Sequence, residues 1–481
     1  MADIVSEIHN SCLRNGKKIS IVYDGNVISY ERLDKEVQQL SSFFKDIGFC
    51  SGMRSVLVVD NPFLYIVGLL ALWSLEIVVV PIDSLEGSKY LFKSIQDSQS
   101  HWVICDHGFC GDLIQDLYKF SETELYDIYK VHDNSKDEMN NESNDAIMFF
   151  TSGTVGKPKC VLYSHDAMRN NVISQAKAIA LNQNDVLFTP LSVSLPGTLT
   201  IGVLPVLCQG ATLILNSSSI PGQINKYVNK YKPSVFLAIP FIYNLLGNTK
   251  STLPEQWESV RMCITSSAKM DKRTREKFYS RSGQTVHSIY CSSEAGAITF
   301  APENKCLELN NSVGYALEGV EIKIRWLSGG GQKSKDGEIL ISGKNISKGY
   351  FNNVKLNKQL FFGRWIRTGD YGYLDSDGAL ILTGRGSITI NVGGYLVNPE
   401  EVEEVIEQYD CVKDSLVYGV ANKTSGESIA VDIVLRKSCR PFSFTELQEF
   451  CMEKLPMHKV PRDYKIVLEI VKGRNNKKKR K

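Results

Sequence analysis

The segment FFTSGTVGKPKCVLYSH, residues 149–165, follows an apolar run and gathers glycine, hydroxyl and lysine residues into one short stretch. Glycines allow successive backbone N–H groups to converge on an anion, while hydroxyls add donors and lysines add positive charge. A Walker A loop needs the pattern G-x-x-x-x-G-K-[ST], and Gly153 and Gly156 are too close together for it. Pro158 would also block the helix that completes a Walker site. The segment therefore predicts a phosphate loop of a different kind, and a P-loop nucleotidase is disfavoured.

Short apolar runs rich in β-branched residues alternate with helix-length segments in the first half of the chain. The runs occupy residues 55–60, 76–83, 101–106, 146–150, 185–189, 211–215 and 234–239. Strands of this composition are buried on both faces, which is typical of a parallel sheet in an α/β domain. Helices are expected over 62–74 and 166–180, with Ser164 or Asp166 as the N-cap of the second.

The pattern changes twice in the second half of the chain. From about residue 310, short strands punctuated by glycine indicate a β-barrel or meander. From about residue 386, helix and strand patterns alternate over a length that suits one small domain. We predict an α/β fold with two domains. The first, residues 1–385, combines parallel-rich αβ layers with a small β-barrel, and the second, residues 386–481, is a small α+β domain.

Composition excludes several classes of protein. The 481 residues are 43% hydrophobic and 22% charged, as in ordinary globular proteins. The first residues do not form a signal peptide, and no apolar segment reaches the roughly 18 residues of a membrane span. Twelve cysteines without CxxC pairs indicate thiols in a reducing compartment, so we predict a cytoplasmic protein. A net charge of +2 favours neither a nucleic-acid nor a membrane partner.

The phosphate loop is followed by further motifs along the chain. TSGTVGKPK (151–159) resembles the signature loop of the adenylate-forming superfamily, which comprises acyl- and aryl-CoA ligases, peptide-synthetase adenylation domains and firefly-type luciferases. Further motifs resemble that family in the same order: SIYCSSEAG (288–296), GEILISGKNISKGYF (337–351), RTGDYGYLDSDGALILTGR (367–385), INVGGYLVNPEEVEEVI (390–406) and HKVPRDYKIV (458–467). The resemblance covers the chain from about residue 50 to its end.

The resemblance implies a two-step reaction. A carboxylate attacks the α-phosphate of ATP to give an acyl-adenylate and pyrophosphate, and a thiol then displaces AMP to give a thioester. The implied phosphate ligands are Thr151, Ser152, Gly153, Thr154, Gly156 and Lys159. The other implied roles are Mg²⁺ binding for Glu294, adenine stacking for Tyr290, a hydroxyl for Ser293, and ribose binding for Asp370 and Arg385. Glu294 and Thr154 are also counted as catalytic.

The resemblance also implies a C-terminal domain that reorients between the two steps, with Ser387 at the hinge and Gly394 beside the pantetheine arm. Lys477 matches the family's catalytic lysine, although Lys478 or Lys472 could take that role. A basic run at a chain end is usually a solvated tail, and it is only weak evidence for a nuclear localisation signal or an RNA-binding tail.

Several positions depart from the family pattern. They are Val155 and Cys160 in the phosphate loop, Ser293 in place of threonine, Ser387 at the hinge and Val471 before the final lysine motif. A catalytically impaired relative that acts as a binding module is therefore an alternative. A luciferase or a stand-alone amide ligase shares the same motifs.

The resemblance also places the acid pocket. Its predicted residues are Ser192, Val193, Ser194, Gly197, Ile239, Ser266, Ser267 and Ile289. Residues 192–202 contain no acidic residue to pair with an α-ammonium, and a buried unpaired ammonium is unfavourable. We therefore expect a neutral carboxylic acid, aliphatic or aryl, over an amino acid. The acceptor is predicted to be CoA or a stand-alone holo carrier protein acting in trans. The acid, the pathway and the oligomeric state stay open.

Overall fold

A computed structural model shows the protein as two compact units, Met1–Glu321 with Ile341–Ile366, and Ile322–Leu340 with Arg367–Lys481. The structure describes residues 4–84, 88–106, 117–122, 126–131, 144–151, 159–267, 270, 272–302, 312–326, 336–385, 390–392, 395–397, 399–422, 426–436, 439, 442–455, 457–471 and 478. The second unit contains residues 386–481 and also takes in strands that precede residue 385. The domain boundary after residue 385 stays a prediction.

The first unit contains an eight-stranded sheet with the order β19-β9-β8-β4-β3-β5-β7-β6. Its strands are β3 (Arg54–Val58), β4 (Val78–Pro81), β5 (Trp102–Cys105), β6 (Leu117–Glu122), β7 (Asp127–Val131), β8 (Asp145–Thr151), β9 (Lys159–Ser164) and β19 (Gly349–Tyr350). β3 pairs in parallel with β4 and β5, and β4 pairs in parallel with β8. Residues of β3, β4 and β5 are buried throughout, as their apolar runs predict.

A second sheet of this unit runs in the order β16-β15-β14-β13-β12-β10-β11-β1-β2. Its strands are β1 (Ile19–Tyr23), β2 (Asn26–Ser29), β10 (Val186–Thr189), β11 (Thr212–Leu215), β12 (Val235–Ala238), β13 (Met262–Thr265), β14 (Val286–Ser292), β15 (Gly296–Ala301) and β16 (Ser312–Ala316). The strands from β1 to β14 pair in parallel along the path β1-β11-β10-β12-β13-β14. The two sheets confirm the predicted α/β class.

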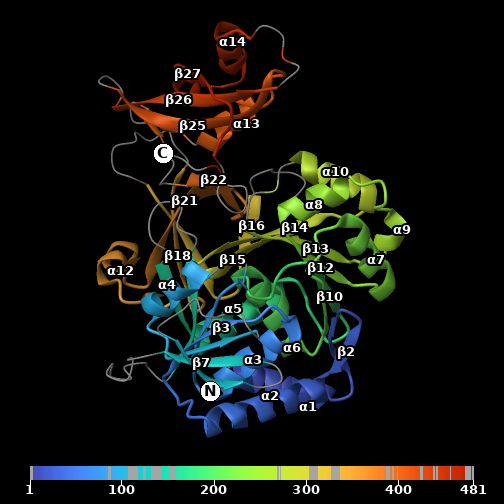
Figure 1. The fold of residues 1–481 in the computed structure, drawn as a ribbon. Coiled ribbons are helices and arrows are strands. Elements are labelled where there is room, and N and C mark those ends of the chain that lie inside the picture. Colours follow the sequence, from blue (N-terminus) through green and yellow to red (C-terminus); the bar gives the residue numbers. More distant parts are fainter. Residues whose placement is uncertain are drawn as a thin grey trace. The chain divides into compact units, whose positions relative to one another are not determined.

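Helices cover the faces of these sheets (Figure 1). They are α1 (Ile4–Asn15), α2 (Tyr30–Asp46), α3 (Pro62–Ser74), α4 (Ser88–Ser98), α5 (His165–Ala178), α6 (Leu204–Gln209), α7 (Pro221–Tyr231), α8 (Pro240–Gly247), α9 (Pro254–Trp257), α10 (Lys272–Ser282) and α12 (Val354–Leu360). α7, α8, α9 and α10 pack on one face of β12, β13 and β14, where Ile224, Tyr243, Trp257 and Phe278 form a buried core with Phe236. Among the described residues, no helix is both long and apolar enough to cross a membrane.

The predicted helices over 62–74 and 166–180 appear as α3 and α5. The Ser164 hydroxyl accepts a hydrogen bond from the Ala167 backbone N–H at 3.2 Å, which identifies Ser164 as the N-cap of α5. Since Ser164 also ends β9, the chain turns directly from the strand after the phosphate loop into a helix.

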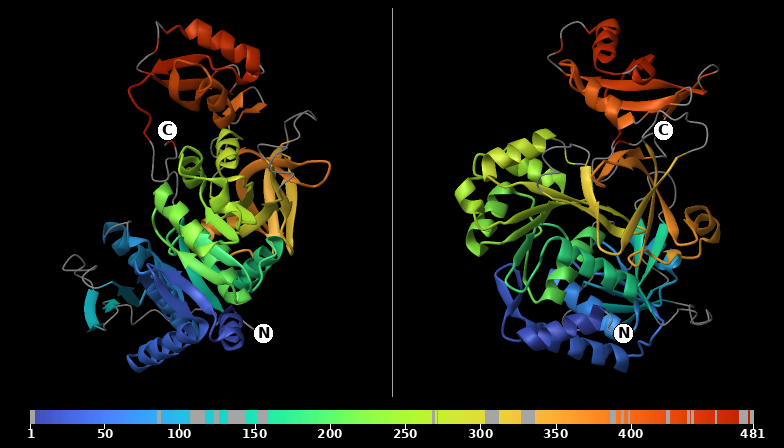
Figure 2. Two further views of the ribbon diagram at one scale, coloured as in Figure 1. Left: turned by 90° about the vertical axis from the view of Figure 1, so that its right-hand side faces the viewer. Right: turned by 180° about the vertical axis from the view of Figure 1, so that it is seen from behind.

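The second unit contains most of β17 (Val320–Arg325), β18 (Gly337–Gly343) and β21 (Trp365–Leu374), and all of β22 (Leu380–Arg385). Within the described residues these strands follow the order β17-β18-β21-β22 and do not close on themselves, so the small barrel is not confirmed. A separate five-stranded sheet holds β23 (Ile390–Val392), β24 (Tyr395–Val397), β25 (Val412–Asn422), β26 (Gly426–Leu435) and β27 (Asp463–Ile466). Two helices, α13 (Pro399–Ile406) and α14 (Phe444–Lys454), pack on this sheet around Val402, Val417, Val431 and Leu447 (Figures 1 and 2). This part has the predicted α+β character.

One pair of cysteines corrects the sequence analysis. Cys411 and Cys439 form a disulfide, with their Cα atoms 5.0 Å apart, whereas only thiols were expected. The two residues flank the hairpin of β25 and β26, in which Val412 is the register partner of Leu435. This pairing brings together cysteines that are 28 residues apart in the sequence, so their spacing resembles no short motif. A reducing compartment is not supported by this pair.

We expect reduction of this disulfide to lower the local free energy of unfolding by about 3–4 kcal/mol, because the bond closes a loop of 28 residues. Hydrogen exchange of β25 and β26, measured with and without a thiol reductant, tests this. The variant Cys439→Ser should match the reduced protein. The variant Cys50→Ser, which removes an exposed thiol, should change stability by less than about 0.5 kcal/mol. Equal protection of the oxidised and reduced proteins would refute the prediction.

Candidate functional site

The predicted metal ligand Glu294 lies in the turn between β14 and β15. The Ser292 hydroxyl accepts a hydrogen bond from the Ala295 backbone N–H at 3.1 Å, which closes the turn. Gly296 has a φ of +61°, and a Cβ atom there would collide with the Asn171 side chain of α5. This position therefore requires glycine. The turn presents a partly buried carboxylate at the carboxyl end of a parallel strand, where ligands bind in open α/β sheets.

Tyr350 of β19 holds the Glu294 carboxylate. Its hydroxyl donates a hydrogen bond to Glu294 Oε1, and the Ser347 backbone N–H donates to the Glu294 carbonyl at 2.9 Å. The Tyr350 backbone is fixed in turn by the Asn357 side chain, with two contacts of 2.8 Å. Burial, and the neighbouring Glu294 charge, raise the pKa of Tyr350 well above its ordinary value. Tyr350 therefore stays a hydrogen-bond donor to this carboxylate at neutral pH.

Lys159, the first residue of β9, also contacts Tyr350. Its Nζ is 5.6 Å from the centre of the Tyr350 ring, a cation–π distance. β19 pairs with β9, with Tyr350 opposite Val161. β9 also pairs with β8, and Lys159 is the register partner of Thr151. The two ends of the predicted phosphate loop are therefore held together, with a cation at one of them.

Two predicted nucleotide-binding residues, Tyr290 and Ser293, lie on β14 and in the turn that follows it. Tyr290 lies in β14 with 7% of its surface exposed. Ser293 is exposed, and its carbonyl accepts a hydrogen bond from the Tyr163 hydroxyl at 2.8 Å. Tyr163 thus ties β9 to the segment that carries Glu294.

The predicted ribose pair lies in the second unit. Asp370 and Arg385 are register partners in the antiparallel pair of β21 and β22. Asp370 is 4% exposed, and its backbone N–H donates to the Thr368 hydroxyl at 3.0 Å. The structure thus places opposite each other two residues that are distant in the sequence, while the Arg385 side chain lies outside the described residues.

Three predicted acid-pocket residues lie next to the carboxyl ends of β12 and β13, and a fourth lies within β14. Ser266 follows β13, and its hydroxyl is 3.0 Å from the Cys291 thiol of β14. Ser267 has a φ of +74°, an unfavourable conformation for serine that is typical of functional sites. A Cβ atom on Gly197 would lie 3.7 Å from the Ser267 hydroxyl. Ile239 follows β12, whereas Ile289 lies in the middle of β14 and is 4% exposed.

Ser192 and Ser194, two other predicted pocket residues, belong to a hydrogen-bonded chain that the sequence analysis did not include. The Ser192 and Ser194 hydroxyls are 2.8 Å apart, and Ser194 donates to the Asp83 carboxylate at 2.8 Å. Val193, between them, is 4% exposed. Asp83 follows β4 in the other sheet, so no local pattern links it to Ser194. The Asp83 carboxylate therefore lies beside these serines, although residues 192–202 themselves contain no acidic residue.

Several predicted residues fall outside the described part of the chain. They are Ser152, Gly153, Thr154, Gly156, Ser387, Gly394 and Lys477, together with the side chains of Thr151 and Arg385. Lys478, which the sequence analysis kept as an alternative to Lys477, is described. Its ammonium pairs with carboxylates of its own unit.

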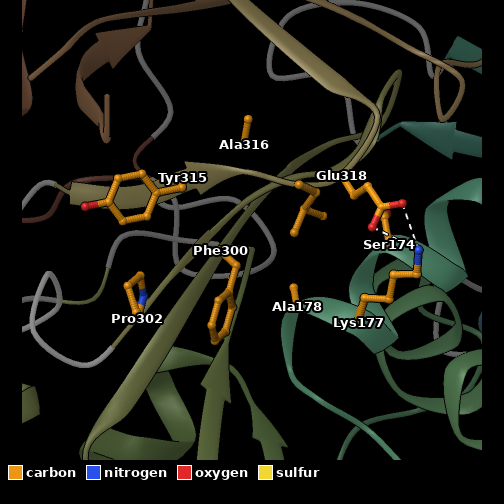
Figure 3. A pocket seen from close by; sticks show the side chains of 9 residues that line it. Ser174, Lys177, Ala178, Phe300, Pro302, Tyr315, Ala316 and Glu318 are labelled. Carbon is orange, nitrogen blue, oxygen red and sulfur yellow. Dashed lines mark hydrogen bonds and ion pairs between the residues drawn. The ribbon is translucent and has the colours of Figure 1, made fainter. Parts of the chain in front are cut away.

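A hollow of about 400 Å³ lies between the carboxyl end of α5, β15 and the end of β16. Figure 3 shows Phe300 and Tyr315 lining it, with Lys177 and Glu318 paired at one side. The Lys177–Glu318 distances are 2.7 and 2.9 Å. None of its lining residues was predicted, and its one lysine already has a carboxylate partner.

Replacing Tyr350 with phenylalanine is expected to raise the KM for ATP, the substrate that the family resemblance implies, about ten- to a hundredfold, because one hydrogen bond to a carboxylate is worth about 1.5–3 kcal/mol. Initial rates at varied ATP concentration test this. Tyr126→Phe is the matched control, since the Tyr126 hydroxyl also donates from a buried position, to the Leu64 carbonyl at 2.7 Å. An unchanged KM for Tyr350→Phe would mean that Tyr350 does not hold a working Glu294.

Residues 8–351 match the family described as AMP-binding enzyme, and residues 401–477 match the AMP-binding enzyme C-terminal domain. A 2-succinylbenzoate–CoA ligase of Bacillus subtilis is 23% identical over 468 residues, which cover 96% of this chain and 93% of that protein. A mitochondrial malonate–CoA ligase of Homo sapiens is 25% identical over 528 residues, which cover 99% of this chain and 91% of that protein.

A long-chain-fatty-acid–CoA ligase of Bacillus subtilis is 27% identical over 369 residues, which cover 74% of this chain but only 62% of that protein. Among solved structures, ATP-bound MatB from Rhodopseudomonas palustris has a TM-score of 0.83 at 20% identity, with 99% of this chain and 97% of that chain covered. The amide bond synthetase McbA from Marinactinospora thermotolerans has a TM-score of 0.83 at 22% identity, with 99% and 98% covered. These likenesses confirm the fold.

Proposed function

The chain belongs to the family of AMP-binding enzymes, the adenylate-forming superfamily that its motifs resemble, and we propose that it joins a carboxylic acid to a thiol in two half-reactions. In the first, a carboxylate oxygen attacks the α-phosphorus of ATP, the bond to the β-phosphate bridging oxygen breaks, and pyrophosphate leaves. In the second, a thiolate sulfur attacks the acyl carbon, AMP leaves, and the thiol proton passes to solvent. The predicted class, an AMP-forming acid–thiol ligase, agrees with the relatives, which are CoA ligases.

The contact between Glu294 and Tyr350 carries this proposal. It brings a carboxylate to the flank of the phosphate loop, where Lys159 supplies a cation. The described residues contain no group of three or more metal-binding side chains. A single carboxylate nevertheless fits Mg²⁺, which proteins commonly bind through one or two carboxylates together with substrate phosphates. In our proposal Glu294 holds the ion that accompanies ATP, and the ion neutralises phosphate charge.

The remaining roles follow from the same assignment. Lys159 and the loop before it bind the β- and γ-phosphates, Tyr290 stacks on adenine, and Asp370 accepts hydrogen bonds from the ribose hydroxyls. Lys477 approaches the reacting carboxylate and α-phosphate, and Ser387 lies at the hinge between the half-reactions. Each of these roles is proposed from the family resemblance.

CoA is the acceptor that the relatives favour. The 2-succinylbenzoate, malonate and long-chain ligases that resemble this chain are all CoA ligases. Gly394 lies in the motif proposed to contact the pantetheine arm. A holo carrier protein presents the same arm and is kept as the alternative, as is an amide-forming reaction like that of McbA.

The acid is proposed to be neutral, aliphatic or aryl, because Ser192, Val193 and Ser194 bring only hydroxyl and apolar groups of their own. One observation favours a second candidate, an amino-acid-activating enzyme. Asp83 accepts a hydrogen bond from Ser194, and a carboxylate is the group that would pair with an ammonium.

Pyrophosphate release with Mg²⁺-ATP, and hydroxylamine as an acyl trap, tests the proposal across a panel of aliphatic, aryl and amino acids. Release with neutral acids alone supports the first candidate, and release with amino acids supports the second. CoA and a holo carrier protein are then offered in turn to the active acid. No release with any acid would refute the enzymatic proposal and leave a binding module.

A further inference from the structure

The Lys478 ammonium lies among three carboxylates near the end of the chain. Its Nζ is 2.6 Å from Glu407 Oε1, 3.1 Å from Glu403 Oε2 and 3.2 Å from Asp414 Oδ1. The Lys478 side chain is 18% exposed, and that of Glu403 is 6% exposed. An ion pair this well covered is screened by salt much less than an ordinary surface pair.

Other hydrogen bonds fix the three carboxylates in place. Glu403 Oε1 accepts from the Val417 backbone N–H at 2.8 Å. Glu407 Oε1 accepts from the Ser415 hydroxyl at 3.1 Å, and Asp414 accepts from the Ser415 backbone N–H at 3.0 Å. Glu403 and Glu407 are four residues apart along α13 and its continuation, where like charges destabilise a helix. A cation at this point therefore joins α13 to β25 and relieves repulsion within the helix.

The charge state of Lys478 is consistent with this arrangement. Burial by itself disfavours the ammonium, but the attraction of Glu403, Glu407 and Asp414 is larger in sum and raises the pKa of Lys478 above its ordinary value. Lys478 therefore stays protonated at neutral pH. An ammonium held by three carboxylates cannot also neutralise charge on a nucleotide, which argues against Lys478 as the catalytic lysine.

We propose that Lys478 is a positioning residue: by binding Glu403, Glu407 and Asp414 it fastens the chain end to α13 and β25 and so fixes which neighbouring lysine serves in acyl-adenylate formation. The inference rests on the proposed function. The backbone at residue 478 forms a single β-bridge, which fixes the same point of the chain a second time. Residue 478 is thus held both through its backbone and through its side chain, so Lys478 itself is not the lysine that reaches the nucleotide.

The test is Lys478→Met in the full chain, with each half-reaction measured separately. Pyrophosphate release should fall about ten- to a hundredfold, since a displacement of about 1 Å can have that effect. Thioester formation from supplied acyl-adenylate should stay within about twofold, and so should the KM for ATP. Lys478→Arg should keep most of the activity. Hydrogen exchange of residues 470–481 should be faster in Lys478→Met, an effect that requires no substrate.

Two further variants separate positioning from general stability. The double variant Lys478→Met/Glu407→Gln lacks both the ammonium and one of the carboxylates that would otherwise repel each other. Its Tm should therefore recover, while pyrophosphate release stays low. If release recovers with Tm, the role is only structural and the inference is wrong. Lys459→Met is the matched control, because Lys459 forms a comparable ion pair with Glu401 of the same helix, at 2.6 and 2.7 Å. This variant should release pyrophosphate at a rate within about twofold of the wild type.

The outcomes also distinguish the inference from the function on which it rests. A wild-type protein that releases no pyrophosphate with any acid refutes the proposed function. A wild-type protein that is active, with Lys478→Met equally active and its chain end equally protected, refutes the positioning role alone.

Discussion

Replacement of Lys477 with alanine is expected to lower pyrophosphate release about a hundredfold or more, while thioester formation from supplied acyl-adenylate continues at nearly the wild-type rate. The reason is the charge that each half-reaction develops. Attack on the α-phosphate builds negative charge that an ammonium would stabilise, whereas in the second step AMP leaves from an adenylate that has already formed. Separate assays of the two half-reactions make the measurement.

Lys472→Ala is the matched control, because Lys472 is the other lysine that the sequence leaves as a candidate and it too lies in the basic chain end. Its pyrophosphate release should stay within about twofold of the wild type. If Lys472→Ala instead loses adenylation, the catalytic role moves to that residue. Loss of both half-reactions in Lys477→Ala would show that Lys477 acts on more than the first step.

Replacement of Glu294 with alanine should reduce kcat/KM for Mg²⁺-ATP about a hundredfold, because it removes the carboxylate proposed to hold the ion and leaves the Tyr350 hydroxyl without its partner. Raising the Mg²⁺ concentration should restore part of the rate. Initial rates over a grid of ATP and Mg²⁺ concentrations show both effects.

Two control variants sharpen this test. Glu294→Gln retains an oxygen that accepts from Tyr350 but removes the charge, so it should require a higher Mg²⁺ concentration, as Glu294→Ala does, while keeping the turn intact. Glu318→Ala removes an exposed carboxylate of the same unit that pairs with Lys177, and its kinetics should match the wild type. Unchanged ATP kinetics in Glu294→Ala would remove Glu294 from the site.

The central strands and helices could be predicted because burial constrains them locally. β3 and β4 are buried at every residue, so their sequences are mostly apolar. The helix predicted over 62–74 has the observed bounds of α3, since Asn61 caps its start and Pro62 suits its first turn. The β-barrel was predicted from short glycine-punctuated strands. Such strands indicate turns but do not determine whether a sheet closes.

The candidate site shows which information the sequence lacks. Glu294 and Lys159 could be named from motifs, but Tyr350 was passed over although it lies in a motif that was recognised. Its hydroxyl reaches Glu294 because β19 pairs with β9, and a pairing between distant segments leaves no local pattern. Asp83 was missed for the same reason, since its partner Ser194 lies in the loop after β10, a strand of the other sheet. The Cys411–Cys439 pair likewise depends on the register of a hairpin.

The pairing of β19 with β9 has a consequence for biosynthesis. The ribosome delivers residues 159–164 long before residues 349–350, so in the emerging chain β9 has no partner on its outer side and exposes a row of backbone donors and acceptors. A site that depends on the most separated strand pairing of its sheet forms late and folds slowly. Translation that stops before Gly349 therefore yields a polypeptide with the phosphate loop and the Glu294 motif, no Tyr350 to bind Glu294, and an edge prone to aggregation.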